Sequence, residues 1–429
     1  MKTPYPYQEE AIQKALESTG LIVADECGLG KTIVAIETAK RSRGDTTSWR
    51  CLIMCPPALI PQWIDEIEEQ DPGQPVYVVN RQPVAFGSLT GYFVMSIYDL
   101  TASYVREALG TVLFDLMIID EAHRIKNRQT KTAKYAKAVP AARRIALTGT
   151  PMEKTPADLW SLLNWVSPDD FKVYWSFVHK NLEVEAGYWE RYIIGGPKDP
   201  IKFGELLAPH VVRRTKEEVV TDLPERLTFE VRVDMTPKQK DLYNRVKQSK
   251  DILVHIDEDK DLLVLNVLSQ ITKLQQISSW PRLLDDGFTD ESGKLDWLWT
   301  FIEDHPDDRM VIFTRFRDLA WDLSQRLESD VVIGGLRKQT PDPKYVVGTI
   351  DAMGEGLNFQ WAKHAIFLDS HWSNTKMSQA IDRIHRVNIT EPKNIYFLHS
   401  CREDRLILHA MEKKMTQSEL VYYYLNEAD

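Results

Sequence analysis

The chain has 429 residues, of which 43% are hydrophobic and 27% charged, and its formal net charge is −10 at pH 7. This length and composition predict two or three globular domains, each with its own core, and exclude a low-complexity or fibrous protein. No apolar run reaches membrane-spanning length and the opening residues 1–4 are polar, so we expect an intracellular protein with no membrane partner. The net charge does not exclude nucleic acid, because a basic groove can coexist with acidic outer surfaces.

The first predicted element is an amphipathic helix that begins near Gln8 and carries Ala11, Ile12, Ala15 and Leu16 at helical spacing. The amide of Gln8 holds both a donor and an acceptor, so it can read the edge of an adenine ring. The alternative for Gln8 is an ordinary surface residue.

A short apolar strand at residues 21–23, a glycine loop at 24–32 and a helix-like stretch at 33–40 follow. Gly28 and Gly30 allow backbone N–H groups to approach phosphates, and the start of the helix supplies free donors and the positive end of its dipole. The order strand, loop, helix therefore predicts a phosphate-binding loop.

In this loop Lys31 is predicted to bind the β- and γ-phosphates of a nucleoside triphosphate, and Thr32 to hold Mg²⁺. The strict pattern has a glycine where Asp25 stands. A plain glycine turn between a strand and a helix is therefore the alternative.

Further apolar strands are predicted at residues 51–55, 76–79 and 92–96, with a helix near 61–67. Strands that alternate with helices indicate a parallel sheet and an α/β fold. Cys51 and Cys55 lie on one face of their strand, and we interpret them as small buried thiols.

Four apolar residues at 116–119 predict a buried strand that ends in Asp120 and Glu121. Parallel sheets place their ligands at this end of the strands. Asp120 is predicted to bind Mg²⁺, and Glu121 to orient and deprotonate an attacking water. A strand that simply ends in two acids is the alternative.

The apolar strand at 145–147 ends in Thr148, Gly149, Thr150 and Pro151. The two threonine hydroxyls can couple a nucleotide pocket to bound nucleic acid, and an ordinary Gly-Pro turn is the alternative.

Residues 25–32, 120–127 and 147–151 together resemble motifs I, II and III of superfamily 2 helicases. More narrowly, they resemble the SWI/SNF-like translocases, whose phosphate loop carries Asp-Glu before its glycines. That resemblance accounts for Asp25, and it assigns residues 1–156 to a first RecA-like lobe.

Residues 157–293 are rich in aromatic and charged side chains, with helices predicted at 236–250 and 262–280. They are similar to the helical protrusions of the same family, so we expect a helical insertion here. Arg213 and Arg214 are candidates for contact with a phosphate backbone, or for an ion-pairing surface cluster.

Strands predicted at 310–316, 345–350 and 364–369 begin a second lobe, residues 294–429. Residues 351–358 resemble motif V, and Gly356 and Asn358 suit a loop that closely approaches a phosphate or a ribose.

Residues 379–386 resemble motif VI. On a helix, Gln379, Arg383 and Arg386 share one face, where a fixed guanidinium can stabilise charge on a γ-phosphate. A solvated helix face is the alternative. Residues 387–389 depart from the Ile-Gly-Gln of the family, and the short stretch before motif V predicts a shortened second lobe.

The resemblance implies two RecA-like α/β lobes in tandem with a helical insertion between them. It also implies that ATP and Mg²⁺ bind in the cleft between the lobes. The implied catalytic residues are Lys31, Glu121, Arg383 and Arg386, and the implied nucleotide contacts include Gln8 and Gln379. The implied activity is ATP-driven translocation of a monomer along double-stranded DNA.

Two alternatives stay open at this point. One is a strand-separating helicase that acts on RNA or forked DNA, such as the motor of a restriction system. The other is a nucleotide-switched DNA clamp without motor activity, which the altered end of motif VI and the shortened second lobe would favour.

Overall fold

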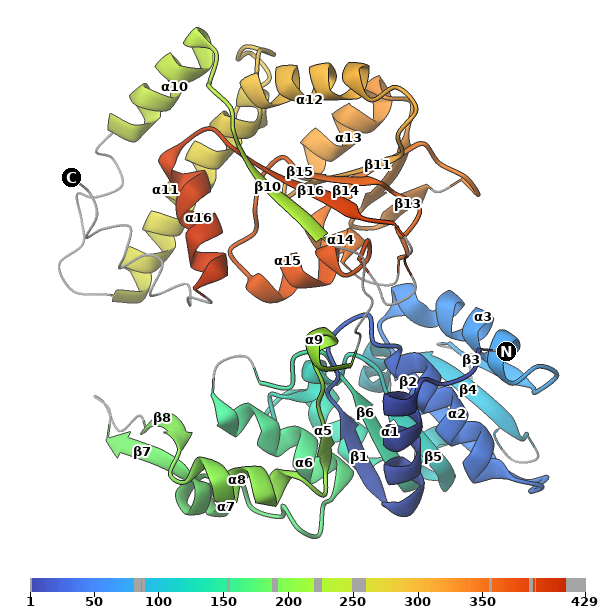
Figure 1. The fold of residues 1–429 in the computed structure, drawn as a ribbon. Helices are drawn as coiled ribbons and strands as arrows, with labels where there is room; N and C mark the ends of the chain where they lie inside the picture. Colours follow the sequence, from blue (N-terminus) through green and yellow to red (C-terminus); the bar gives the residue numbers. More distant parts are fainter. Residues whose placement is uncertain are drawn as a thin grey trace. The chain divides into compact units, whose positions relative to one another are not determined.

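The computed structural model describes residues 2–80, 86, 89–152, 155–186, 192–219, 226–248, 260–338, 340–354, 357–385, 389 and 391–413 (Figure 1). The chain divides into two compact units, Met1–Thr221 and Asp222–Asp429. Each unit is built on a seven-stranded sheet that is parallel in all or nearly all of its pairs, which confirms the predicted α/β class with two parallel-sheet lobes. None of the helices in these ranges combines the length and the apolar character needed to cross a membrane.

The sheet of the first unit is parallel throughout, in the order β3-β4-β2-β5-β6-β1-β9. Its strands are β1 (Gly20–Val23), β2 (Arg50–Cys55), β3 (Val76–Val79), β4 (Gly91–Ser96), β5 (Phe114–Ile119), β6 (Ala141–Leu147) and β9 (Val211–Val212). The strands predicted at 51–55, 76–79, 92–96, 116–119 and 145–147 are all present.

Helices cover both faces of this sheet, so side chains on successive positions of a strand enter two different cores. Cys51, Ile53 and Cys55 face one core, and Leu52 and Met54 face the other. The first core is completed by α1 (Pro6–Glu17), α2 (Lys31–Arg43) and α3 (Ile60–Gln70), and the second by α4 (Ser103–Gly110), α5 (Lys131–Ala138) and α6 (Leu159–Val166). The two cysteines therefore share a buried face, as predicted.

The stretch predicted as a helical insertion, 157–293, is divided between the two units. Its first part adds α7 (Tyr174–Asn181), the hairpin of β7 (Leu182–Ala186) and β8 (Tyr192–Pro197), α8 (Pro200–Leu207), β9 and α9 (Lys216–Val219) to the first unit (Figure 1). Its second part gives the second unit β10 (Arg226–Arg232), α10 (Pro237–Gln248) and α11 (Lys260–Ser279). Both predicted helices are thus present, but β9 and β10 join the main sheets.

The sheet of the second unit has the order β10-β16-β15-β11-β14-β12-β13 and is parallel except for the β12–β13 pair. Its further strands are β11 (Met310–Thr314), β12 (Asp330–Ile333), β13 (Leu336–Lys338), β14 (Tyr345–Thr349), β15 (His364–Phe367) and β16 (Lys393–His399). Its further helices are α12 (Gly293–Asp304), α13 (Arg317–Arg326), α14 (Ile350–Met353), α15 (Asn374–Ile381) and α16 (Arg402–Glu412). The short stretch before motif V therefore holds one helix, one strand and a hairpin.

A buried ion pair joins two helices of the second unit. Lys294 of α12 is fully buried, and its Nζ lies 2.8 Å from Asp404 Oδ2 of α16 and 2.8 Å from the carbonyl oxygen of Leu368. Asp404 also accepts hydrogen bonds from the hydroxyl of Ser278 on α11 and from the backbone N–H of Ser400. The pair therefore links α11, α12 and α16 to the end of the sheet.

We expect Lys294→Met to destabilise the second unit by about 3–5 kcal/mol, because the substitution leaves the Asp404 carboxylate buried without its cation. The matched control is Lys238→Met, since the side chains of Lys238 and its partner Glu291 are 69% and 47% exposed. An exposed pair of this kind contributes about 0–1 kcal/mol. Urea unfolding of both variants measures the difference, and equal losses of stability would contradict this prediction.

Candidate functional site

The loop at residues 24–32 connects β1 to α2 in the first unit. Gly28 has a φ of +90°, and Gly30, the N-cap of α2, has a φ of +75°. L-residues rarely adopt this left-handed backbone. A Cβ atom at Gly30 would also lie 2.4 Å from Gln8 Nε2. The predicted glycines are therefore required by the path of the loop as well as by its closeness to α1.

Lys31, the first residue of α2, folds its side chain back over this loop. Its Nζ donates to the carbonyl oxygens of Asp25 at 2.8 Å and Glu26 at 3.3 Å. Thr32 follows in the first turn of α2 and is partly exposed. A cation, a hydroxyl and the N-terminus of a helix thus come together, which is a suitable environment for phosphate.

Gln8 is a buried residue of α1, which rules out the surface alternative. Its Nε2 donates to the carbonyl oxygen of Leu29 at 2.8 Å, and its Oε1 accepts from the N–H of Tyr5 at 2.9 Å. The hydroxyl of Tyr7 also donates to Leu29 at 3.1 Å. Gln8 therefore fastens α1 to the glycine loop, and recognition of adenine by its amide stays a prediction.

A segment far along the chain supports the same loop. The N–H of Ala24 donates to Val212 at 2.7 Å, the N–H of Glu26 donates to Arg214 at 2.9 Å, and Glu26 Oε2 accepts from the N–H of Lys216 at 2.8 Å. These bonds continue the β1–β9 pairing beyond the sheet.

Arg214 is placed against the loop by this pairing. Its Nη1 lies 3.7 Å from Asp25 Oδ2, its Nη2 lies 3.5 Å from Glu10 Oε2, and it donates to the carbonyl oxygen of Tyr7. Burial raises the pKa of Asp25, and the charge of Arg214 opposes that rise. Arg214 thus takes the ion-pairing alternative in this structure, whereas Arg213 is exposed.

The two predicted acids follow the carboxyl end of β5, at the same end of the parallel strands as the glycine loop that follows β1. Asp120 Oδ2 accepts from Trp63 Nε1 at 3.0 Å, and its Oδ1 accepts from the N–H of Glu121 at 2.8 Å. Glu121 has a φ of +49°, a left-handed conformation that is strained for a residue with a Cβ. Its Oε2 lies 3.2 Å from Nδ1 of His123. This turn gives the two neighbouring carboxylates different directions.

Desolvation, followed by the charge of Glu121, raises the pKa of Asp120 to about 6. The unfolded value is about 3.9, so the folded chain binds the proton more tightly, and the contribution of Asp120 to stability falls as pH rises from about 4 to 6. Asp120→Asn is therefore expected to stabilise the nucleotide-free protein on the order of 1 kcal/mol at pH 7.5, and less at pH 5. Chemical unfolding at both pH values measures this, and an effect independent of pH would contradict it.

The turn after β6 completes this edge. Thr148 is fully buried, and its Oγ1 accepts from the N–H of Thr150 at 3.2 Å. A Cβ atom at Gly149 would lie 2.5 Å from Cys27 Sγ and 3.7 Å from Lys31 Nζ, so the turn packs directly on the glycine loop. Since β5, β6 and β1 are neighbours, the three predicted motifs of the first unit meet at one edge of its sheet.

In the second unit, the segments that resemble motifs V and VI are in contact. Arg383 Nε donates to the carbonyl oxygen of Gly354 at 2.9 Å, and the carbonyl oxygen of Arg383 accepts from the N–H of Phe359 at 2.8 Å. Gln379 is buried in α15, and Asn358 is exposed and bonds to Gln360. The other two predicted residues, Gly356 and Arg386, lie outside the described residues.

The prediction that Gln379 and Arg383 share one face of a helix is wrong in its geometry, because α15 ends at Ile381. Arg383 lies in the turns that follow, where its N–H bonds to Ala380 and the N–H of Ile384 bonds to Ile381. These two bonds span three residues, whereas the N–H of His385 bonds to Ile381 over four, so the turns after α15 mix 3₁₀-type and α-type hydrogen bonds. The bond that Arg383 donates to Gly354 and the bond that its carbonyl oxygen accepts from Phe359 hold the turn in place.

Sequence reasoning missed a buried cluster at the end of β15. Asp369 Oδ2 accepts from Thr314 Oγ1 at 2.7 Å, and its Oδ1 accepts from the N–H of Arg315 at 2.6 Å. The guanidinium of Arg315 lies over the ring of Trp372, 4.1 Å from its centroid. Burial raises the pKa of Asp369. An apolar strand that ends in an acid, as at Asp120, is the signal that could have identified this residue.

Comparison with known proteins identifies two families along the chain. Residues 7–283 match the SNF2-related domain, and residues 293–388 match the helicase conserved C-terminal domain. Among the solved structures, the SWI2/SNF2 ATPase core of Sulfolobus solfataricus in complex with dsDNA is 26% identical, with a TM-score of 0.47 over 98% of this chain and 94% of that one.

Several curated relatives are similar over most of this chain. The "Uncharacterized ATP-dependent helicase MG018" of Mycoplasma genitalium is 27% identical over 91% of this chain and 39% of its own length. The "DNA annealing helicase and endonuclease ZRANB3" of Mus musculus is 26% identical over 92% and 38%, and the "Putative ATP-dependent helicase/translocase YwqA" of Bacillus subtilis is 28% identical over 89% and 44%. The chain thus spans about two fifths of the length of these relatives. Since the SNF2-related match covers well over half of the chain, this protein belongs to the SNF2-related domain family, as its resemblance to SWI/SNF-like translocases predicted.

Proposed function

We propose that this protein is an ATPase, stimulated by nucleic acid, that uses ATP to translocate along double-stranded DNA. The observation that carries the proposal is the meeting of the glycine loop, the two acids after β5 and the turn after β6 at one edge of a parallel sheet. Membership of the SNF2-related family supports it.

In this proposal the first unit binds the nucleotide. The N-terminus of α2 and Lys31 hold the phosphates, and Gln8, which bonds to Leu29 of the same loop, is the proposed contact to the adenine. The carboxylate of Glu121 takes the proton of the attacking water.

The donors in this unit also fit Mg²⁺, which prefers oxygen ligands. Thr32 offers a hydroxyl, and Asp120 offers a carboxylate whose direction is fixed by Trp63 and by the backbone N–H of Glu121. When bound, Mg²⁺ would offset the negative charge of the phosphates. Ionised Asp120 is the form that binds the metal, so its pKa of about 6 predicts weaker Mg²⁺ binding below that pH.

The second unit supplies Gln379 and two arginines, Arg383 and Arg386, to the same reaction. Their charge stabilises the transferring γ-phosphoryl group. Because Arg383 is bonded to Gly354, a change at the nucleotide would reach the motif V loop, with Asn358 at its surface. This connection is how hydrolysis would be coupled to movement along DNA.

Double-stranded DNA is the proposed track, held mainly through its phosphates by a monomer inside the cell. Arg213, Thr148 and Thr150 are the proposed contacts or coupling residues in the first unit. Two of the relatives carry names that state action on DNA or translocation, which supports a nucleic-acid partner.

The test is steady-state ATP hydrolysis without nucleic acid and with single-stranded DNA, duplex DNA or RNA, at one low salt concentration because phosphate contacts weaken with salt. Strong stimulation by duplex DNA, lost in Glu121→Gln, is the expected result, and a triplex-displacement assay would then follow movement. Preference for RNA or single strands, with release of a strand from a tailed duplex, would instead identify a helicase. ATP binding without stimulated turnover would identify a switched clamp.

A further inference from the structure

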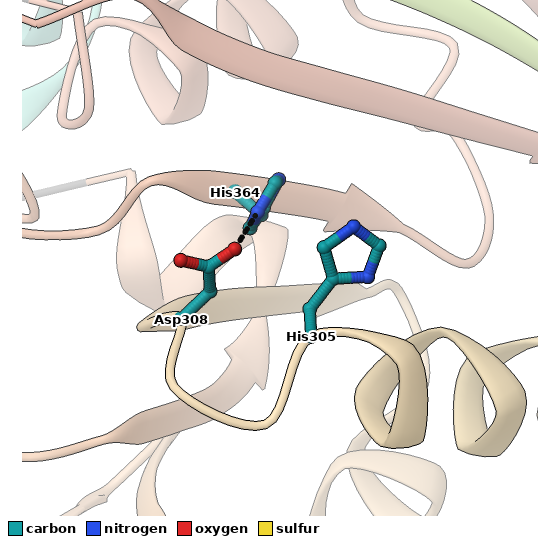
Figure 2. Close-up of side chains that lie close together, drawn as sticks. All are labelled: His305, Asp308 and His364. Carbon is teal, nitrogen blue, oxygen red and sulfur yellow. Dashed lines mark hydrogen bonds and ion pairs between the residues drawn. The ribbon is translucent and has the colours of Figure 1, made fainter.

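A cluster of three metal-binding side chains lies in the second unit, away from every residue assigned above. His305 and Asp308 belong to the connection between α12 and β11, and His364 is the first residue of β15. One ligand atom from each lies within 4.8 Å of the others (Figure 2). Because β11 and β15 are paired neighbours, the sheet itself brings these residues together.

His305 is already oriented for metal binding. Its Nδ1 lies 2.9 Å from the carbonyl oxygen of Phe301, and its ring stacks on the ring of Phe301 with centroids 4.2 Å apart. A carbonyl oxygen only accepts, so Nδ1 carries the proton and Nε2 presents a lone pair. A histidine that donates one ring nitrogen to a backbone carbonyl while the other binds the metal is the usual arrangement at metal sites.

His364 is 2% exposed, and its ring lies edge-on to Phe301 at 5.3 Å and 5.1 Å from the ring of His305. Its Nε2 lies 2.9 Å from Asp308 Oδ2, and its Nδ1 lies 3.4 Å from Asn394 Nδ2. Metal binding at Nε2 would move the ring proton to Nδ1, where the Asn394 amide oxygen could accept it after a flip. No net proton is gained or lost in this exchange.

We propose that His305, Asp308 and His364 bind one divalent transition-metal ion of the zinc class. Two imidazole nitrogens and one carboxylate oxygen favour Zn²⁺, Co²⁺ or Ni²⁺ over Mg²⁺ or Ca²⁺, which prefer oxygen ligands alone. Lys363, whose Nζ lies 3.0 Å from each oxygen of Asp308, is the cation that the metal has to compete with.

The location indicates a stabilising role instead of a catalytic one. Asp308 and His364 lie at the amino ends of β11 and β15, whereas Thr314 and Asp369, at the other ends of these strands, belong to the edge that carries the motifs. The metal would fasten the α12–β11 connection to β15. A ligand of the folded state alone raises stability by mass action.

The experiment is calorimetric Zn²⁺ titration and thermal unfolding of the chelator-treated full chain, with Co²⁺ absorption as a spectroscopic check. We expect saturating Zn²⁺ to raise Tm by a few degrees, and His305→Ala to weaken binding at this site by tenfold or more. Lys363→Met is expected to tighten binding, because it removes the competing cation. The matched control is His179→Ala, another helix-associated histidine that stacks on an aromatic ring, here Trp175.

Asp308→Asn, which keeps the side-chain shape, replaces His305→Ala if that variant is unfolded without metal. Equal Zn²⁺ affinity in the wild type and in the folded variant would overturn the proposal, as would the absence of a Tm shift in the wild type. The ATPase rate is no part of this readout, so the metal site and the proposed function fail or succeed separately.

Discussion

Glu121→Gln is expected to leave ATP binding nearly unchanged and to lower ATP turnover by about 10³-fold. Glutamine has the same shape and tolerates the same backbone, so the strained turn at φ +49° and the N–H bond to Asp120 are kept. What the substitution removes is the only property the mechanism requires of this side chain, a carboxylate that can accept a proton. Nucleotide binding by fluorescence and phosphate release under saturating ATP measure the two effects separately.

Lys31→Ala is the matched comparison. It removes the positive charge proposed to bind the phosphates, whereas Glu121→Gln removes the general base. We expect it to weaken ATP binding, and to loosen the glycine loop by deleting its bonds to Asp25 and Glu26. If Glu121→Gln kept its turnover while Lys31→Ala lost it, the base would have to be sought elsewhere, with Asp120 the nearest other carboxylate.

Much of the fold could be predicted because its signals are local. Apolar runs such as 116–119 are too short for helices and too apolar for exposed strands, and charged residues mark both ends of this run. The parts that could not be predicted depend on pairing between distant segments. Val211–Val212 is too short to indicate a strand, and it becomes one only because the edge of β1 is available.

The same difference applies to the site. Gly28, Gly30, Lys31, Asp120 and Glu121 could be proposed from the sequence because each motif is continuous, and the parallel sheet brings the motifs together. Arg214 was singled out, but its position against Asp25 follows from the β1–β9 pairing. The cluster of His305, Asp308 and His364 has no sequence signal at all, because its third member comes from a different strand.

The free-energy cost of burying charged side chains is a second reason why the sequence did not predict every buried residue. Asp25, Lys294 and Asp369 are charged side chains in buried positions, where composition alone would place apolar residues. Burial of such groups costs free energy, which specific partners must offset. Lys294 and Asp369 lie near the motif-bearing end of the second sheet and Asp25 lies in the glycine loop of the first unit, and each has specific partners.

Separate substitution of the two motif VI arginines is expected to divide their roles. Arg386→Ala should lower DNA-stimulated turnover by about 10³-fold or more if its guanidinium acts on the γ-phosphate, and should leave Tm unchanged. This expectation rests on sequence order and on the family resemblance, since Arg386 lies outside the described residues.

Arg383→Ala is expected to lower both turnover and stability, because the bond from its Nε to Gly354 holds the motif V loop against the end of α15. A hydrogen bond with a charged donor contributes about 1.5–3 kcal/mol, so the loss should be visible in thermal unfolding, and Arg383→Lys should recover little of it because an ammonium lacks the fork geometry. The pair of measurements, turnover and Tm, is what separates a catalytic arginine from a positioning one. An unchanged rate in Arg386→Ala would assign the catalytic charge to Arg383, and unchanged rates in both variants would show that neither arginine takes part in the chemistry.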